Sequence, residues 1–348
     1  MKPLRFAIFG AGFWARCQLA AWREVGGVEC VAIYNRSRDK AEAFARDLGI
    51  PAVYVDAEKL LREVKPDFVD NITEVGGHKP LSLLCAKHRI PCICQKPMAA
   101  SLKDARQMVA AFTKAKTPFF VHENWRWQSP MRALINTLRS GVIGTPFRGR
   151  LTFTNGFDVW ANQPALRDLE QFILTDIGTH VLDTARACFG EADSLYCQLH
   201  RTLRPAVKGD NVATVLLSMG EARTSVVVEL AYAKTPLERE CFPQTLAFVE
   251  GPLGSIEVTN DYWLRVTTKK GTHTRHHAPP RYAWADPRYD VAQSSMVACH
   301  RDLLAALRGG RAAETSGMDN LKTMELVFAA CDSARTNSVV TFPRMRTN

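Results

Sequence analysis

Two glycines near the N-terminus have the spacing of a phosphate-binding turn. Gly10 and Gly12, followed by the small residue Ala15, form a G-x-G-x-x-A pattern after an apolar run at residues 5–9. In such a turn the first glycine permits the sharp bend, the second lets backbone amides approach a pyrophosphate, and the small residue lets helix and strand pack closely. The stretch therefore predicts a dinucleotide site, provided that a strand and a helix flank it.

Lys96, Asp176 and His180 have side chains suited to moving a proton and stabilising charge. Lys96 directly follows an apolar run that reads as a strand (residues 91–95), so its ammonium is expected at the carboxyl end of that strand. Asp176 and His180 are four residues apart at the start of a predicted helix (residues 175–189) and share one helical face. A solvated lysine and a helix cap beside a structural histidine are the simpler interpretations.

A third stretch, residues 122–128, places polar and aromatic side chains after another predicted strand. His122 and Arg126 can hydrogen-bond a polar ligand, and Trp125 offers a flat apolar wall. Packing at a junction between two domains is the simpler interpretation of the same residues.

Strands and helices alternate through the first 124 residues. The predicted strands are residues 5–9, 28–34, 52–55, 67–72, 91–95 and 118–122, and the predicted helices after the first are residues 39–48, 57–63, 80–88 and 102–116. Such alternation predicts a parallel, doubly wound sheet with its ligand crevice at the carboxyl ends of the strands. The strand and helix that the glycine turn requires are therefore present.

The pattern changes near residue 125. A linking helix at residues 131–139 precedes β-rich runs at residues 148–155, 195–202, 212–219, 225–232, 245–249, 256–259 and 263–268, and helical periodicity returns at residues 300–307 and 321–334. We expect an α/β dinucleotide-binding domain over residues 1–124. An α+β domain with a mainly antiparallel sheet is expected over residues 125–348, its last helix packing back on the first domain.

Composition narrows the class of protein. The chain has 348 residues, 46% of them hydrophobic and 23% charged, with no apolar run as long as a membrane span and no signal peptide pattern. Ten cysteines are scattered without a paired motif, so we expect reduced thiols and a cytoplasmic location. The net charge of +10 is dispersed, which argues against nucleic acid as a partner. No metal site is expected, because the histidines at 273, 276 and 277 lack acidic or cysteine neighbours.

Taken in order along the chain, these motifs resemble the Gfo/Idh/MocA oxidoreductase family. The resemblance extends nearly to the last helix. Its marks are the glycine turn, the strand and loop at residues 68–78, Gln95-Lys96-Pro97 in place of an E-K-P motif, the D-x-G-x-H-x-x-D pattern from Asp176 to Asp183, and Thr315-Ser316-Gly317 before a long helix.

The resemblance implies a Rossmann domain, an open-faced sheet domain and hydride transfer between a nicotinamide cofactor and a carbinol of a sugar or polyol. Lys96, Asp176 and His180 are carried over as the catalytic set. His180 is expected to act as the base, Lys96 to hold the reacting oxygen, and Asp176 to anchor a neighbouring hydroxyl and orient the imidazole. The roles of Lys96 and His180 as base stay open at this point. The expected NAD(P)-binding residues are Gly10, Gly12, Phe13, Trp14, Asn35, Arg36, Thr73, Glu74, His78, Gln95 and Lys96.

Three departures from the family pattern affect these expectations. Gln95 replaces the usual glutamate, so it can hydrogen-bond a ribose hydroxyl without adding charge. Glu74 stands where relatives commonly carry proline. At the end of the second strand, Asn35 and Arg36 stand where an acidic residue would exclude a 2′-phosphate, so both NAD and NADP are permitted.

The stretch at residues 122–128 resembles a subgroup of sugar dehydrogenases that includes enzymes acting on the branched pentose apiose. The expected substrate-binding residues are His122, Asn124, Trp125, Arg126, Asp176 and His180, and oxidation at an anomeric carbon to a lactone is the most specific expectation. A glycoside hydrolase working by transient oxidation and a non-catalytic nucleotide sensor are the alternatives. A homodimer or homotetramer is expected, because an open amphipathic sheet needs a cover.

Overall fold

The computed structural model describes residues 2–202, 207–233 and 242–343. These residues divide into two compact units. The first unit contains Met1–Glu123 and Met296–Met324, and the second contains Asn124–Ser295 and Glu325–Asn348. The two units group residues that contact one another. The predicted ranges 1–124 and 125–348 instead group residues by expected function, cofactor binding and substrate binding, so those ranges stay a prediction.

A six-stranded parallel sheet forms the centre of the first unit. Its strand order is β3-β2-β1-β4-β5-β6. The strands are β1 (Leu4–Phe9), β2 (Val28–Tyr34), β3 (Val53–Tyr54), β4 (Phe68–Asn71), β5 (Cys92–Gln95) and β6 (Phe119–His122). β1 and β6 consist largely of buried apolar residues, as strands covered on both faces require, and all four residues of β4 are buried. The predicted doubly wound fold is confirmed.

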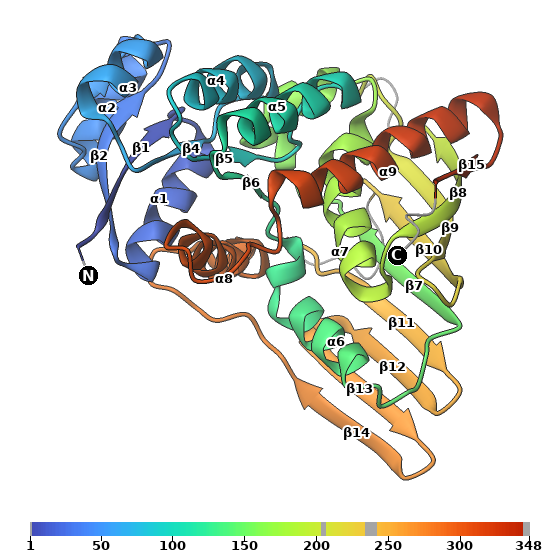
Figure 1. The fold of residues 1–348 in the computed structure, drawn as a ribbon. Coiled ribbons are helices and arrows are strands. Elements are labelled where there is room, and N and C mark those ends of the chain that lie inside the picture. Colours follow the sequence, from blue (N-terminus) through green and yellow to red (C-terminus); the bar gives the residue numbers. More distant parts are fainter. Residues whose placement is uncertain (1, 203–206, 234–241, 344–348) are drawn as a thin grey trace. The chain divides into compact units, whose positions relative to one another are not determined.

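The helices that connect these strands cover both faces of the sheet. They are α1 (Phe13–Val25), α2 (Arg38–Leu48), α3 (Ala57–Val64), α4 (Val75–Lys87) and α5 (Leu102–Ala115). Figure 1 shows α4 and α5 above the sheet and α1 below it. Side chains fix two helix starts: Asp56 accepts a hydrogen bond from the Lys59 amide (3.0 Å), and Ser101 accepts one from the Asp104 amide (3.1 Å).

A nine-stranded mixed sheet forms the centre of the second unit, in the order β14-β13-β12-β11-β7-β10-β9-β8-β15. The strands are β7 (Arg148–Thr154), β8 (Ala192–His200), β9 (Val212–Met219), β10 (Thr224–Ala231), β11 (Leu246–Gly251), β12 (Gly254–Thr259), β13 (Trp263–Thr268), β14 (Gly271–His276) and β15 (Val340–Thr341). β7 and β10 pair in parallel and the other neighbours pair antiparallel. This confirms the mainly antiparallel sheet.

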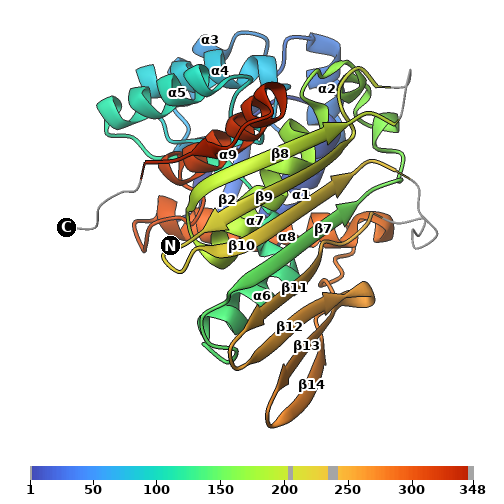
Figure 2. The same ribbon diagram turned by 90° about the vertical axis from the view of Figure 1, so that its right-hand side faces the viewer.

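Helices cover one face of this sheet. α6 (Ser129–Arg139) contacts β12 and β13, and α7 (Thr179–Phe189) contacts β7 and β10. Figure 2 shows the sheet with both helices behind it, so the nearer face is not covered by them. The strands alternate between buried and exposed residues, which is the pattern of a sheet with one covered face.

Several helix boundaries differ from the prediction. α4 begins at Val75, five residues before the predicted start at Pro80, because the His78 ring bonds two carbonyls and holds a Gly-Gly-Pro-containing segment helical. α8 (Asp290–Leu307) begins ten residues before the predicted start. Its first turns are buried nearly all round, so they show no amphipathic period. β14 and β15 are strands that the prediction omitted, since β14 is exposed throughout and β15 has two residues.

The C-terminal part of the chain contributes to both units. α9 (Gly317–Thr336) belongs to the first unit up to Met324 and to the second from Glu325. In the first unit, the Val121 amide donates a hydrogen bond to the Thr315 carbonyl (2.9 Å).

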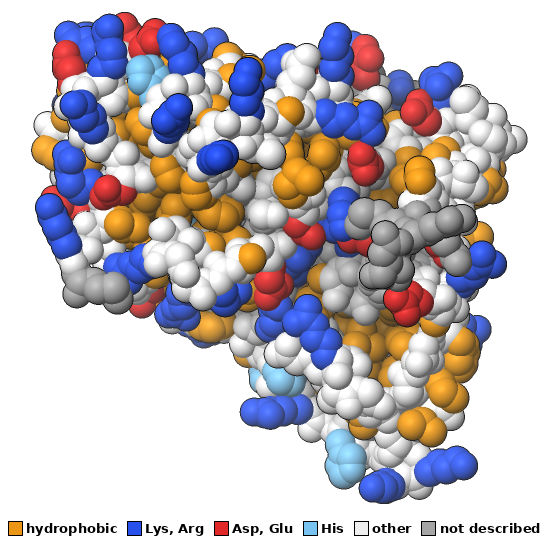
Figure 3. Space-filling view, in the orientation of Figure 1, with side chains coloured by type: hydrophobic (Ala, Val, Ile, Leu, Met, Phe, Trp, Pro, Cys, Tyr) orange, Lys and Arg blue, Asp and Glu red, His pale blue; other side chains and the backbone are white. Residues whose placement is uncertain are grey.

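No helix among the described residues has the length and apolarity needed to cross a membrane. Lys and Arg side chains are spread over the face shown in Figure 3, interspersed with acidic ones. The predicted cytoplasmic location stays a prediction.

Candidate active site

The turn between β1 and α1 has the shape of a phosphate cradle. Gly10 has a φ of +106°, and a Cβ there would lie 2.7 Å from the Ile72 carbonyl oxygen, so a larger residue is excluded. Gly12 stands at the N-cap of α1 with a φ of −86°, and a Cβ there would meet nothing within 4 Å. The space next to Gly12 and the helix N-terminus is therefore open to an anion. Phe13 and Trp14 begin α1, with ring centroids 4.9 Å apart.

The end of β2 carries the residues that would meet the adenine ribose. Asn35 is half-buried and donates a hydrogen bond to the Ser37 carbonyl (3.0 Å), whereas Arg36 is exposed. Neither contributes negative charge. A ribose diol and a 2′-phosphate would both find a hydrogen-bond donor here.

The loop after β4 is organised by a buried asparagine. Asn71 accepts a hydrogen bond from the Thr73 hydroxyl (2.7 Å) and donates to the His78 carbonyl (3.3 Å). Glu74 is exposed at the N-cap of α4. The loop is thus held by its own side chains, and the Glu74 carboxylate lies outside that network.

His78 joins the β4 loop to the end of β5. Its two ring nitrogens lie 2.9 Å from the Thr73 and Pro97 carbonyl oxygens. Burial lowers the pKa of His78, so the neutral ring donates to one of these carbonyls at a time. The Gln95 side chain accepts a hydrogen bond from the Lys96 amide (2.7 Å), and the Lys96–Pro97 peptide is cis. These contacts fix the backbone that carries Lys96.

The predicted cofactor residues therefore lie after the carboxyl ends of β1, β2, β4 and β5, which are neighbours in the sheet. This is the edge where open α/β sheets bind ligands. The open space at Gly12 and the donors around it suit a dinucleotide. His122, from the last position of β6, is buried, and its ring lies edge-on to His300 with centroids 4.8 Å apart.

In the second unit, His180 lies against an indole. It occupies the second position of α7, 4% exposed, and its ring stacks on Trp125 with centroids 4.2 Å apart and planes 18° apart. Trp125 begins a 3-10 turn, η1 (Trp125–Trp127), and its indole donates to the Thr245 hydroxyl (2.9 Å).

Arg126 lies in a buried ion-pair network. Its Nε and Nη2 atoms lie 2.7 and 2.6 Å from the two carboxylate oxygens of Asp183. Arg186 approaches the same carboxylate (3.7 Å) and binds Glu191 with two hydrogen bonds of 2.9 Å. Arg126, Asp183 and Arg186 are buried, whereas the Glu191 side chain is 49% exposed. The network contains two positive and two negative groups, so its charges balance.

Asp176 lies in a π-helical turn, η4 (Leu174–Gly178), which leads into α7. The prediction had a regular helix through these residues; one extra residue per turn is typical of functional sites. The Tyr232 hydroxyl donates a hydrogen bond to the Asp176 carboxylate. Burial and the neighbouring carboxylate raise the pKa of Tyr232 well above its ordinary value, so the phenol stays protonated and remains a donor.

Family models match both parts of the chain. The model of the "oxidoreductase family, NAD-binding Rossmann fold" matches residues 4–123, and the model of the "GFO/IDH/MocA C-terminal domain" matches residues 131–257. The chain belongs to the Gfo/Idh/MocA family. Its first unit therefore carries an NAD-binding Rossmann domain, in agreement with the open glycine turn.

Similar proteins align with this family member over nearly its full length. A D-apiose dehydrogenase of Paraburkholderia graminis is 42% identical, over 98% of this chain and 90% of the relative. A D-apiose dehydrogenase of Rhizobium rhizogenes is 40% identical, over 98% of both chains. A crystal structure of an oxidoreductase from Agrobacterium radiobacter in complex with NAD+, L-tartaric acid and magnesium is 39% identical, with a TM-score of 0.94 and 98% coverage of both chains.

The predicted site residues of this Gfo/Idh/MocA chain fall into two groups. Lys96 and the cofactor residues belong to the first unit, whereas Asp176, His180, Trp125 and Arg126 belong to the second. Asn124 also belongs to the second, where its amide donates to the Ala292 carbonyl (3.1 Å) and the Ser295 hydroxyl (2.6 Å).

Sequence reasoning missed two residues that support the second group. Tyr232 ends an apolar run and Thr245 begins one, and a polar side chain at the end of a buried strand is the signal that indicates them. The sequence does not indicate which residue each of them bonds, because Tyr232 lies 56 positions from Asp176 and Thr245 lies 120 positions from Trp125.

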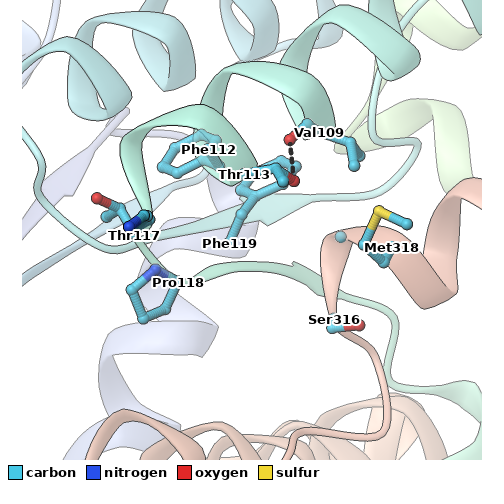
Figure 4. A pocket seen from close by; sticks show the side chains of 10 residues that line it. Val109, Phe112, Thr113, Thr117, Pro118, Phe119, Ser316 and Met318 are labelled. Atoms are coloured by element: carbon cyan, nitrogen blue, oxygen red, sulfur yellow. Dashed lines mark hydrogen bonds between the residues drawn. The ribbon is translucent and has the colours of Figure 1, made fainter.

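A separate hollow of about 300 Å³ lies in the first unit between α5 and the start of α9. Figure 4 shows Phe112 and Phe119 on one side of it and Met318 on the other. Its lining is mainly apolar and carries none of the predicted site residues.

Proposed function

We propose that this protein is an NAD-dependent sugar dehydrogenase that oxidises a carbinol carbon, with D-apiose or a similar branched pentose as substrate and a lactone as product. Two relatives at 40–42% identity over 98% of the chain, both named D-apiose dehydrogenase, support the substrate class. The observation that carries the proposal is that the open cradle at Gly12 occurs in a chain that also has Lys96, Asp176 and His180 in the family pattern.

The cofactor would be held by the first unit. The turn at Gly10 and Gly12, with the N-terminus of α1, would bind the pyrophosphate, and Asn35 the adenine ribose. Gln95 and the loop from Thr73 would contact the nicotinamide half. Bound NAD supplies the acceptor for the hydride that leaves the carbinol carbon.

The remaining steps belong to side chains of this chain. We assign His180 Nε2 or Nδ1 as the acceptor of the hydroxyl proton, because a neutral imidazole accepts a proton near neutral pH. The Lys96 ammonium would hold the reacting oxygen and stabilise the negative charge that develops on it. The Asp176 carboxylate, oriented by Tyr232, would accept a hydrogen bond from a neighbouring hydroxyl of the sugar.

His122, Asn124, Trp125 and Arg126 remain proposed substrate contacts. All four are buried. Arg126 already donates hydrogen bonds to Asp183, and Asn124 already donates to Ala292 and Ser295. Their part in sugar binding is therefore expected to include shaping the pocket wall as well as direct contact.

Use of NADP in place of NAD is a finer proposal. Arg36 is exposed next to Asn35, with no acidic residue there to repel a 2′-phosphate. We expect NAD to be the better cofactor and NADP to be accepted, and Arg36→Asp to lower the use of NADP while sparing NAD.

A homodimer or homotetramer is proposed through the uncovered face of the second unit's sheet. One row across that face contains Leu216, Val227, Arg150 and Phe248, which mixes apolar and charged side chains as protein interfaces do. Leu216 is 47% exposed, which is high for a leucine in a central strand.

The experiment measures the absorbance of reduced nicotinamide in assays of the purified protein with D-apiose, other aldoses, polyols and inositols. Each substrate is assayed once with NAD and once with NADP. We expect turnover with a pentose and NAD, and its loss in Lys96→Ala and His180→Ala. A glycosidase acting through transient oxidation would instead cleave glycosides without net cofactor turnover. A nucleotide sensor would bind NAD and oxidise nothing, and either result would overturn the proposal. Neither alternative is favoured, because the similar relatives are named dehydrogenases.

A further inference from the structure

The imidazole of the proposed base, His180, packs against one face of the buried Trp125 indole. The Trp125 indole lies parallel to the imidazole within 18°, at a centroid distance of 4.2 Å. Trp125 is 3% exposed and His180 is 4% exposed, so both rings are enclosed by protein. Turning the imidazole out of this plane would push its edge into the indole, which close packing opposes.

Trp125 is itself held from several directions. Its Nε1–H donates to the Thr245 hydroxyl at 2.9 Å. Phe153 and Phe242 meet its ring edge-on, with centroids 5.7 and 5.8 Å away. An indole fixed by one hydrogen bond and two aromatic contacts has little rotamer freedom left, so it can serve as a rigid support.

Arg126, the residue after Trp125, links the η1 turn to α7. Its guanidinium donates hydrogen bonds to both carboxylate oxygens of Asp183, which lies three positions after His180 on α7. Such paired, charge-assisted bonds fix the angle of the guanidinium as well as its distance. The η1 turn therefore contacts α7 at two successive levels, one aromatic and one ionic.

We propose that Trp125 is a positioning residue for His180, setting the plane of the imidazole so that its nitrogen faces the substrate hydroxyl, with Arg126 and Asp183 keeping the η1 turn in register with α7. The inference rests on the proposed dehydrogenase function. It assigns the indole face that stacks on His180 to positioning and not to sugar stacking, because the imidazole occupies that face.

Trp127 provides the matched control. It is in the same η1 turn, and its ring lies under the Arg132 guanidinium at 3.7 Å, where it does not take part in the His180 stack. Trp125→Leu and Trp127→Leu make the same chemical change two positions apart.

The kinetic experiment compares kcat, KM and the pH profile of kcat/KM for the wild type, Trp125→Leu, Trp125→Phe and Trp127→Leu. We expect Trp125→Leu to lower kcat by about 10- to 100-fold with little change in KM, since a misplaced proton acceptor costs that much. The acidic limb of its pH profile should move, Trp125→Phe should recover most of kcat, and Trp127→Leu should behave as wild type. A rise in KM with kcat unchanged would overturn the proposal in favour of substrate contact.

A second measurement needs no activity. The His180 Cε1–H signal in a proton–carbon correlation spectrum, identified by its absence in His180→Gln, reports the indole ring current directly. We expect this signal to move downfield in Trp125→Leu and to stay in place in Trp127→Leu. An unmoved signal in Trp125→Leu would refute the stack.

If Trp125→Leu does not fold, Thr245→Val tests the same point, because it removes the acceptor of the indole N–H while keeping the side-chain shape. A smaller loss of kcat in the same direction is expected, and an unchanged kcat with an unchanged His180 signal would contradict the proposal. If the wild type oxidises no sugar, the proposed function fails, whereas the spectroscopic result still decides whether the stack exists.

Discussion

At the scale of single residues, the second unit supports its two proposed catalytic groups through aromatic partners. Tyr232 donates to Asp176, and Trp125 stacks on His180. The supporting residues come from β-strand ends and turns far along the chain from η4 and α7. Their removal should therefore affect activity through the orientation of groups that they contact.

Tyr232→Phe removes one hydrogen bond to the Asp176 carboxylate and leaves the ring in place. A buried hydrogen bond to a charged group contributes about 1.5–3 kcal/mol, so we expect a loss of that order in the free energy of unfolding and about a 10-fold or greater loss in kcat/KM. Urea unfolding and initial rates measure the two effects. The control is Tyr196→Phe on β8, which loses a hydrogen bond from the Tyr196 hydroxyl to Asn337 and should keep wild-type kinetics.

Asp70 makes stability depend on pH. Burial raises the pKa of this carboxyl from 3.8 to about 7, and the hydrogen bond from the Trp22 indole (2.8 Å) opposes this in part. Because the folded-state pKa lies above the unfolded one, the stabilising contribution is complete below about pH 3.8 and is lost as pH rises through about 7.

Asp70→Asn removes this titration and keeps an oxygen for the indole N–H. Between about pH 4 and pH 8, we expect the wild type to lose up to about 4 kcal/mol of unfolding free energy relative to the variant. Burial also lowers the pKa of His300 well below its ordinary value, so this residue makes the unfolding free energy fall as the pH drops below about 6.5. Both proteins keep His300, so this effect cancels in the comparison. Urea unfolding across this range measures the difference, and parallel curves for the two proteins would contradict it.

At the scale of elements, the turn between β1 and α1 contains two glycines, two positions apart, that are expected to matter for different properties: Gly10 for folding and Gly12 for cofactor binding. Gly10→Ala places a Cβ at positive φ and against the Ile72 carbonyl, and we expect a loss of about 1–3 kcal/mol in stability. Thermal or urea unfolding checks this.

Gly12→Ala meets no protein atom within 4 Å, so stability should stay within about 0.5 kcal/mol of wild type. Its methyl group would enter the space proposed for the pyrophosphate, and we expect NAD affinity to fall about 10-fold or more. Calorimetric titration with NAD measures the loss. Wild-type affinity in Gly12→Ala would show that the pyrophosphate binds elsewhere.

At the scale of the whole molecule, the uncovered face of the second unit's sheet is expected to pair with another copy. Leu216→Glu places a charge on that face, in β9, and should shift light scattering to a smaller species. Val55→Glu, at an exposed apolar residue of the first unit, is the control and should leave the assembly intact. A wild-type monomer at micromolar concentration would contradict the proposal.

The sequence by itself determined the features that depend on local pattern. Alternating apolar runs and helical periods predicted both sheets, because burial on two faces or one leaves a period along the chain. The spacing of Gly10 and Gly12 predicted the turn, since positive φ and close approach demand glycine. Lys96, Asp176 and His180 could be named as candidates from their motifs, and their joint action stays a prediction.

Only the tertiary structure decided which side chains hold those candidates. The partners of Asp176, Trp125 and Arg126 lie between 56 and 120 positions away in sequence. No local period encodes such pairings. They exist because Tyr232, directly after β10, bonds Asp176 of η4, and Thr245, directly before β11, bonds Trp125 of η1. The early starts of α4 and α8 were hidden for related reasons. In α4 the contacts of the buried His78 ring outweigh the low helix propensities of glycine and proline. In α8 burial on nearly all sides removes the amphipathic period.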